Sequence, residues 1–274
     1  SCGPGGEKPL SGSYFPSVLH RPSPFFAAAF TLVELLVSVA IVGLLAGLGN
    51  AAYQKAASSS RQGVEMSAAK NLGQALQLYI QDNDGSILPG YLDPRDPRVA
   101  NARNEKDQPI SPSHAAQRYP WRLLPYMNYQ VRGGIWVNKL ASQIPESDPY
   151  RDYMVSLVPT LGMNMTYVGG DSRNIQLPGR CATRINRVTH PAGLIAFASA
   201  QYEDPNYGKL DGYFEVKPPT GSSSTGAGLA PRYSGKAVVV TLDGHAEALT
   251  QDPLQDMRRW CDEAAVQNNP NWTP

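Results

Sequence analysis

The sequence is poor in charge and in cysteine. Only 17% of its 274 residues are charged, the formal net charge is +1, and no basic run is interleaved with aromatic residues. This absence argues against a nucleic-acid partner. Three cysteines are too few for the disulfide framework that stabilises small secreted domains. The chain is long enough for one sizeable domain with its own core and one separate element.

The sequence also lacks the familiar motifs of catalysis. It contains no Gly-x-Ser-x-Gly, no His-Glu-x-x-His and no phosphate-binding loop. Asp243, His245 and Glu247 could form a metal or acid–base cluster. However, His245 and Glu247 share one face of a predicted strand, as a solvated pair would. His114 and His190 lie in predicted loops without neighbours at ligand spacing. We therefore expect neither enzyme activity nor a metal or cofactor.

One long apolar run stands out against this background. It covers about 19 residues, 30–48, and carries a single formal charge at Glu34. An apolar run of about 18 residues or more can cross the hydrocarbon core of a membrane as a helix. Because an unpaired carboxylate is costly in such a segment, Glu34 requires a cation as its partner.

The helical pattern continues beyond the apolar run. Residues 50–82 contain no proline, and one apolar stripe recurs at helical spacing, made of Val64, Ala68, Leu72, Ala75, Leu76 and Tyr79. These features predict one helix from about Phe30 to about Asp82, roughly 80 Å long. Its first half, about residues 30–48, would lie in a membrane or a filament core, and its second half would pack on a globular head. Asn83 and Gly85 fit a capping turn at its end.

At the start of this run the sequence resembles the type IV prepilins, a family that includes the pseudopilins of type II secretion. The resemblance is carried by Ala29-Phe30-Thr31-Leu32-Val33-Glu34-Leu35-Leu36-Val37. In that family a prepilin peptidase cuts before the Phe and methylates the new amino group. The resemblance implies a leader over residues 1–29, cleavage between Ala29 and Phe30, and N-methylation of Phe30. Ala29 stands where the family usually has Gly.

The same resemblance implies a function for the whole chain. Glu34 would pair with the N-terminal amine of a neighbouring subunit, an attraction that is strong in a low-dielectric environment. The chain would be a structural subunit of a type IV pilus-like or type II secretion pseudopilus filament. Its partners would be itself or related pilins, the prepilin peptidase, an inner-membrane assembly platform and membrane lipid. Before assembly it would span the inner membrane once with its head in the periplasm, and afterwards it would lie in a periplasmic or cell-surface filament.

Residues 83–274 are expected to form the head, an α+β fold with an antiparallel sheet. Proline and glycine, 24 and 25 in number, predict long loops. The best strand candidates are Leu194–Ser199, Gly212–Val216, Lys236–Leu242 and His245–Leu249. Asp243-Gly244 between the last two predicts a hairpin with a type I′ turn, which needs positive φ at both central residues.

The remaining head segments predict loops and short helices. Residues 89–118 read as a solvated loop, Tyr119–Met127 as a helical turn that plugs the core, and Tyr150–Leu157 as a short helix. A closing helix is expected over Pro253–Ala265. Its inward residues would be Leu254, Met257, Trp260 and Cys261.

The region around Asp243-Gly244 also resembles a C-terminal signature of prepilin-like proteins from planctomycetes and related bacteria. In those proteins a His is separated by nine residues from Asp-Gly, which is often followed by another His. Here Tyr233 takes the place of the first His, and Asp243, Gly244 and His245 match. A structural hairpin is enough to explain the signature.

Two questions stay open from the sequence. Cys181 and Cys261 could form one disulfide in an oxidising compartment, or both could be buried free thiols. The alternative to a filament subunit is a singly anchored surface protein that binds a glycan or protein ligand and uses the helix only as a tether. The abundant loops, tyrosines and tryptophans of the head favour this alternative.

Overall fold

The longest element is helix α1 (Leu32–Asp82), which passes through both units into which the chain divides, Ser1–Ala51 and Ala52–Pro274. The computed structural model describes residues 31–173, 180–206, 208–218 and 227–273. The predicted leader, with Ala29 and Phe30, lies outside the described residues. The predicted C-terminal end of the long helix at Asp82 is confirmed, and Asp84 and Gly85 follow it with positive φ angles of 52° and 78°.

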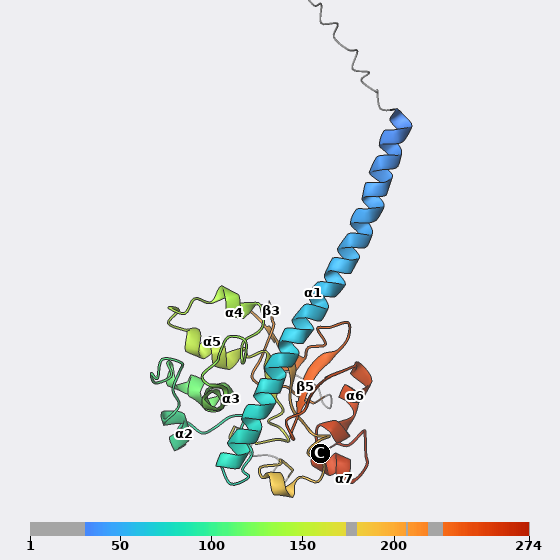
Figure 1. Ribbon diagram of the computed structural model, residues 1–274. Helices are drawn as coiled ribbons and strands as arrows, with labels where there is room; N and C mark the ends of the chain where they lie inside the picture. The colour runs from blue at the N-terminus through green and yellow to red at the C-terminus, as the bar shows by residue number, and fades with distance from the viewer. Residues whose placement is uncertain (1–30, 174–179, 207, 219–226, 274) are drawn as a thin grey trace, which may run out of the picture. The chain divides into compact units, whose positions relative to one another are not determined.

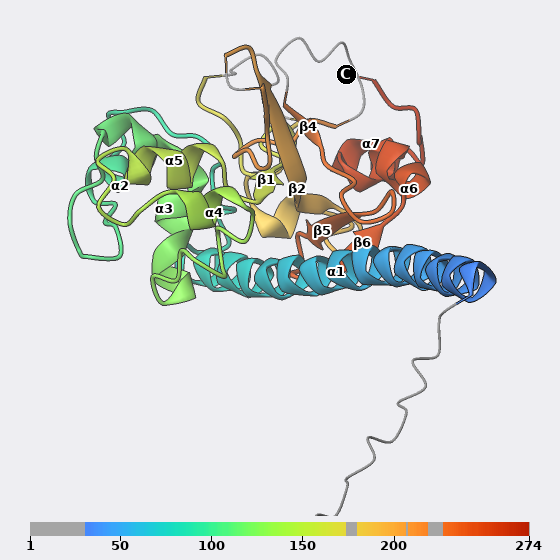
Figure 2. The ribbon, with the colours of Figure 1, turned by 90° about the horizontal axis from the view of Figure 1, so that it is seen from above.

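The second unit contains a six-stranded antiparallel sheet. Its main strand order is β1-β2-β5-β6, and both β3 and β4 pair with the long strand β2. The strands are β1 (Leu161–Met163), β2 (Ile195–Asp204), β3 (Gly208–Leu210), β4 (Ala227–Leu229), β5 (Ala237–Thr241) and β6 (Ala246–Leu249). With the long helix packed on this sheet, the predicted α+β class is confirmed (Figures 1 and 2).

Short helices fill the connections around the sheet. The α-helices are α2 (Pro97–Ala100), α3 (Tyr119–Leu123), α4 (Leu140–Gln143), α5 (Arg151–Leu157), α6 (Gln251–Gln255) and α7 (Asp262–Val266). The 3-10 helices are η1 (Ser113–Gln117), η2 (Leu124–Met127), η3 (Ile185–Arg187) and η4 (Met257–Arg259). Tyr119, Trp121 and Leu124 are buried, so the predicted plug over Tyr119–Met127 is confirmed. Helix α5 confirms the helix expected near Tyr150–Leu157.

The residues of strand β5 alternate between two parts of the core. Val238 and Val240 belong to the core that contains the inward residues of α1, whereas Ala237 and Val239 belong to a smaller core with Trp260. This alternation follows from the two-residue period of a strand. The second half of α1 therefore covers one face of the sheet, and the C-terminal segment covers the other (Figure 2).

Several sequence expectations for the head were wrong. Gly212–Val216 forms no strand and contributes one isolated bridge, from Glu215 to Met163. The closing helix is broken into α6, η4 and α7, although its four predicted inward residues are all buried. Residues 89–118 are not simply a solvated loop, because they bury six apolar side chains: Leu92, Val99, Ala102, Ile110, Ala115 and Ala116.

The predicted stripe on α1 was shifted at one position. Val64 is half exposed, and the inward residue there is Glu65, which is only 2% exposed. The other stripe residues are buried as expected, together with Ala69, Gly73 and Ile80. Because adjacent helical residues point about 100° apart, one of the two neighbours had to face outward. The structure turns the valine outward and buries the carboxylate.

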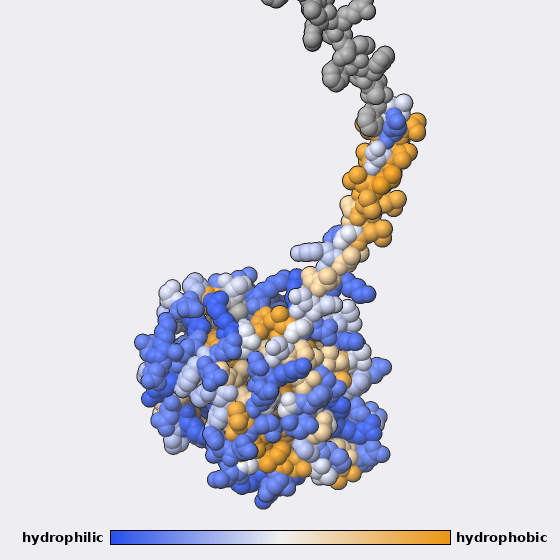
Figure 3. Space-filling model, in the orientation of Figure 1, coloured by the Kyte–Doolittle hydropathy of each residue, from blue (hydrophilic) through white to orange (hydrophobic). Residues whose placement is uncertain are grey.

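The first half of α1 has the opposite character. All described residues from 31 to 56 are exposed, and the large apolar side chains of residues 32–48 are 48–80% exposed. This apolar surface is the concentrated hydrophobic segment in Figure 3. Within the described residues, α1 is the one helix long and apolar enough to cross a membrane. Such an N-terminal helix can serve as a membrane anchor or as a signal sequence.

Candidate functional site

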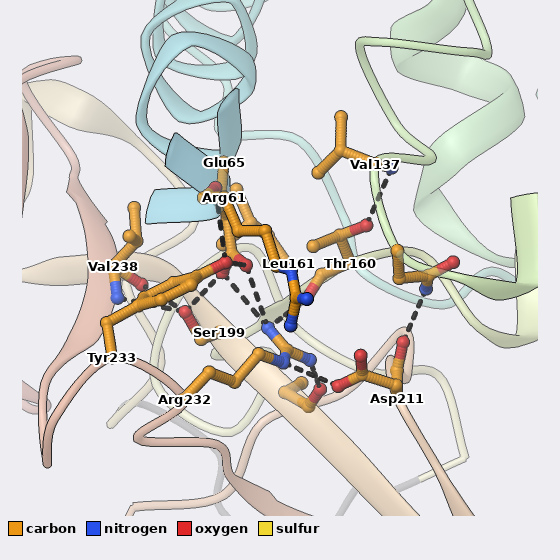
Figure 4. A network of polar contacts seen from close by, with 12 residues as sticks. Arg61, Glu65, Val137, Thr160, Leu161, Ser199, Asp211, Arg232, Tyr233 and Val238 are labelled. Carbon is orange, nitrogen blue, oxygen red and sulfur yellow. Dashed lines mark hydrogen bonds and ion pairs between the residues drawn. The ribbon is translucent and has the colours of Figure 1, made fainter. Parts of the chain in front are cut away.

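The most unusual group of the head is the carboxylate of Glu65. Glu65 is the one acidic residue of α1 between Glu34 and Asp82, and it lies among alanines and leucines on the inward face. A buried carboxylate is costly unless it is paired and hydrogen-bonded. Figure 4 shows how the sheet side of the head meets both requirements.

Three side chains converge on Glu65 from the sheet side. The guanidinium Nη1 of Arg232 lies 3.0 Å from Oε1 and 3.2 Å from Oε2. The hydroxyl of Tyr233 donates to Oε2 at 2.6 Å, and the hydroxyl of Ser199 donates to Oε1. Ser199 also accepts from the backbone N–H of Val238 at 2.9 Å. The carboxylate therefore joins α1 to β2 and to the turn before β5.

Arg232 extends the hydrogen-bond network from Glu65 to the partly exposed Asp211. Its Nε donates to Asp211 Oδ1 at 2.6 Å, and Nη2 donates to the backbone carbonyl of Ala200 on β2. The Arg232 side chain is 14% exposed, whereas that of Asp211 is 44% exposed. One guanidinium thus links a buried carboxylate to a partly solvated one. Pairs of this kind are costly to break on one side, by about 3–5 kcal/mol when fully buried.

A tight turn places Tyr233 against the helix. Tyr233 and Lys236 exchange backbone hydrogen bonds of 3.2 and 3.0 Å, and the two residues between them, Ser234 and Gly235, have φ of 51° and 80°. Positive φ at both central residues is the mark of a type I′ turn. Burial raises the pKa of the Tyr233 phenol, and the neighbouring Glu65 charge raises it further. The phenol is therefore held in its neutral, donating form.

The β5–β6 hairpin touches the same helix farther along. Gln77 donates from its side-chain amide to the backbone carbonyl of Leu242 at 2.6 Å. A Cβ added to Gly73 would lie 2.5 Å from the carbonyl oxygen of Gly244, closer than real side chains approach backbone atoms. Gly73 thus permits close contact between helix and hairpin. Tyr233 and Gly244, both from the predicted signature, contact α1 about two turns apart.

The turn type expected at Asp243-Gly244 was wrong. Gly244 has φ of 88°, but Asp243 does not have a positive φ. Thr241 N–H donates to His245 C=O at 2.8 Å and Gly244 N–H to Thr241 C=O at 2.9 Å. The loop is therefore a three-residue one that ends in a left-handed glycine. Asp243 stabilises it by accepting from the Thr241 hydroxyl at 2.5 Å and from His245 N–H at 3.1 Å.

Two residues of the acid–base cluster considered from the sequence, Asp243 and Glu247, have structural partners. Asp243 is engaged within its own loop, and Glu247 forms an ion pair with Arg259. In the part of the chain that the structure describes, no group of three or more His, Cys, Asp or Glu residues could hold a metal ion. Asp243 and Glu247 are thus used in local structure.

Glu34 lies in the first turn of α1 and caps it together with Thr31. Thr31 donates to Glu34 Oε2 from its backbone N–H at 2.9 Å and from its hydroxyl at 2.8 Å, and Glu34 N–H donates to the Thr31 hydroxyl at 3.2 Å. This reciprocal arrangement is a capping box. Both contacts to the carboxylate use Oε2, so Oε1 keeps acceptor capacity for a cation.

Cys181 and Cys261 are both free thiols in the structure. Cys261 is buried, and Cys181 is partly exposed. Burial raises the pKa of the Cys181 thiol to about 12, and the nearby Cys261 adds to the shift. Because the thiolate is the reactive form, Cys181 should be an inert thiol at neutral pH.

We expect iodoacetamide to alkylate Cys181 at pH 8 at least about 30-fold more slowly than a cysteine in a short peptide. A raised pKa lowers the thiolate fraction more than it increases the nucleophilicity of each thiolate. The rate should keep rising up to pH 10, as peptide mapping by mass spectrometry can measure. Protein unfolded in urea provides the control, and a rate that levels off near pH 9 would contradict the raised pKa.

Sequence reasoning missed Glu65, Arg232, Ser199 and Gly73. The sequence did indicate the position of Glu65, because it lies three residues before Ala68 and four before Ala69, on the face of the stripe.

Comparisons of the chain with models of known protein families, with curated proteins and with solved structures gave no match.

Proposed function

We propose that this chain is a structural subunit of a type IV pilus-like or type II secretion pseudopilus filament, assembled through its N-terminal helix. One observation carries the proposal. A single helix of 51 residues packs its second half into the core of an α+β head and leaves the apolar surface of its first half exposed. An apolar surface of this length needs a membrane or other apolar helices to cover it.

The segment before α1 would be cleaved during maturation. The prepilin peptidase would cut between Ala29 and Phe30 and methylate Phe30, leaving a cation one residue before Thr31. The Glu34 carboxylate of another subunit would accept that amine through the oxygen that its capping box leaves available. In an apolar environment this attraction would be strong.

The first half of α1 would change its surroundings on assembly. Before assembly, the first half of α1 would span the inner membrane with the head in the periplasm. After assembly, it would pack against the helices of identical or related subunits in a periplasmic or cell-surface filament. The assembly platform in the inner membrane would carry out the transfer.

The test separates the charge of Glu34 from its capping role. Glu34→Gln keeps an oxygen that can accept from Thr31 but removes the charge, and Glu34→Ala removes both. We expect each variant to reduce the filament fraction recovered from cells at least about 10-fold, with unchanged total protein by immunoblot. Thr31→Val is the matched control, because it weakens the capping box and keeps the charge.

The outcome decides between assembly and simple anchoring. Intact-mass analysis should also show a chain that begins at N-methylated Phe30. Normal filament recovery with Glu34→Gln and Glu34→Ala, or a chain that keeps its leader in a host with an active prepilin peptidase, would make the helix a tether.

Two observations favour the second candidate, a tethered surface protein that binds a ligand. Tyr202 and Tyr213 stack with ring centroids 4.5 Å apart and an interplanar angle of 11°, and both rings are partly exposed. The Arg173 guanidinium lies 4.1 Å from the centroid of the Tyr91 ring. Aromatic faces with a few polar groups are common in ligand sites. This candidate predicts that Glu34→Ala leaves surface display and ligand binding unchanged.

A further inference from the structure

We propose that Glu65 is a register determinant, a buried charge that fixes where along its length α1 binds the head. Its partners Ser199 and Arg232 are anchored on or beside the central strand β2. This inference goes beyond the proposed function, because it concerns the head unit and holds whether or not the chain assembles.

The apolar character of the stripe does not by itself fix the register of α1, although side-chain size opposes a slide. A slide by four residues moves the helix about 6 Å along its axis and keeps nearly the same face toward the sheet. After that slide, five of the nine buried positions would still be occupied by apolar residues or glycine, whereas Gln77 and Asn83 would take the places of Gly73 and Tyr79. Leu72, Gly73, Leu76, Tyr79 and Ile80 would replace Ala68, Ala69, Leu72, Ala75 and Leu76.

Glu65 makes both neighbouring registers less favourable than the observed one, because only the observed register pairs it with Arg232. A slide in one direction would bring Ala69 to the position of Glu65 and leave the Arg232 guanidinium without its buried counter-charge. A slide in the other direction would bring Arg61 there and place two guanidiniums together. Both alternatives are electrostatically unfavourable because the site is buried, with Glu65 only 2% exposed.

The other close contact of the helix is steric and involves no charge. Gly73 meets the carbonyl of Gly244, which lies in the three-residue loop at the tip of the β5–β6 hairpin. The partners of Glu65 are fixed in the sheet, because Ser199 belongs to β2, which pairs with β1 on one side and β5 on the other. A polar group buried in an apolar interface is a known means of fixing register.

The test removes both members of the buried charge pair and leaves the Asp211 carboxylate, which is 44% exposed, to be hydrated by solvent. Glu65→Leu combined with Arg232→Met replaces both partners by apolar side chains. Ser199 keeps its contacts with Val238, and Tyr233 can donate to the Arg61 carbonyl, 3.4 Å from its hydroxyl. The full chain would be studied in detergent micelles by pulsed electron paramagnetic resonance. Spin labels would be placed on Leu78→Cys and Lys236→Cys, two exposed positions on α1 and on the Tyr233 turn, with Cys2 and Cys181 replaced by serine.

The parent chain is expected to give one narrow distance between the labels. The double variant should give a second distance population, displaced by the one-turn slide of about 6 Å. A purely stabilising role for Glu65 would change the melting temperature and leave a single distance. One narrow distance at the parental value in the double variant would therefore overturn the proposal.

A second variant covers the case in which the double variant does not fold. Glu65→Gln keeps the size of the side chain and loses its charge, and it should show the displaced distance as a minor population. Glu146→Gln, in an exposed loop, is the matched control and should keep one distance. A single parental distance with Glu65→Gln overturns the proposal if the double variant is unfolded.

Discussion

Replacement of Glu65 by glutamine is expected to lower the free energy of unfolding of the head by about 3 kcal/mol. The change leaves Arg232 without its buried counter-charge, and removing one partner of a buried pair costs about 3–5 kcal/mol. The lower value applies because Arg232 is 14% exposed and retains Asp211. For a unit of this size the melting temperature should fall by roughly 6–12 °C. Denaturant unfolding followed by tryptophan fluorescence would measure the change.

The control for this prediction is Glu146→Gln, which makes the same chemical change at an exposed position. Surface substitutions of this kind usually change stability by less than about 0.5 kcal/mol. Equal stabilities of the two variants would mean that the Glu65 network contributes little to the fold.

Replacement of Gly73 by alanine is expected to destabilise the head by about 2 kcal/mol, although alanine favours helix formation. The added Cβ would lie 2.5 Å from the carbonyl oxygen of Gly244, a backbone atom, so helix and hairpin must separate. Overpacking of a core typically costs about 1–3 kcal/mol. Urea denaturation would give the change in unfolding free energy.

Gly63 provides a control of opposite sign on the same helix. It is exposed, and a Cβ added there meets nothing within 4 Å. Gly63→Ala should therefore stabilise the helix by up to about 1 kcal/mol through helix propensity alone. A stabilising Gly73→Ala would show that the helix and the hairpin are not in close contact in solution.

The sequence predicted those parts of the fold that depend on local periodicity. The helix end at Asp82, the plug over Tyr119–Met127 and the β5–β6 hairpin were all evident from spacing and turn residues. The segment Gly212–Val216 was misassigned because Phe214 and Val216 are buried by side-chain packing, with only one bridge to β1. Strand formation there depends on neighbours distant in sequence.

The candidate site was harder to predict because its parts are far apart in the chain. Tyr233 was singled out only as a substitution within a signature, and Glu65 lies 168 residues away from it. A charged residue is ordinarily assigned to the solvent side of a helix, so Val64 was placed inward. Arg232, which follows four strands later in the chain, supplies the counter-charge that reverses this choice. Pairing between distant residues of this kind is a tertiary effect that periodicity cannot reveal.

The wide separation in sequence between α1 and the residues that it contacts also affects folding during synthesis. Gln77 and Leu242 are 165 residues apart, which a ribosome needs roughly 10–30 s to synthesise. Throughout that time the inward face of the helix has no hairpin to cover it. The head can close only when nearly the whole chain has emerged. The nascent helix therefore presents an apolar inward surface until synthesis is nearly finished.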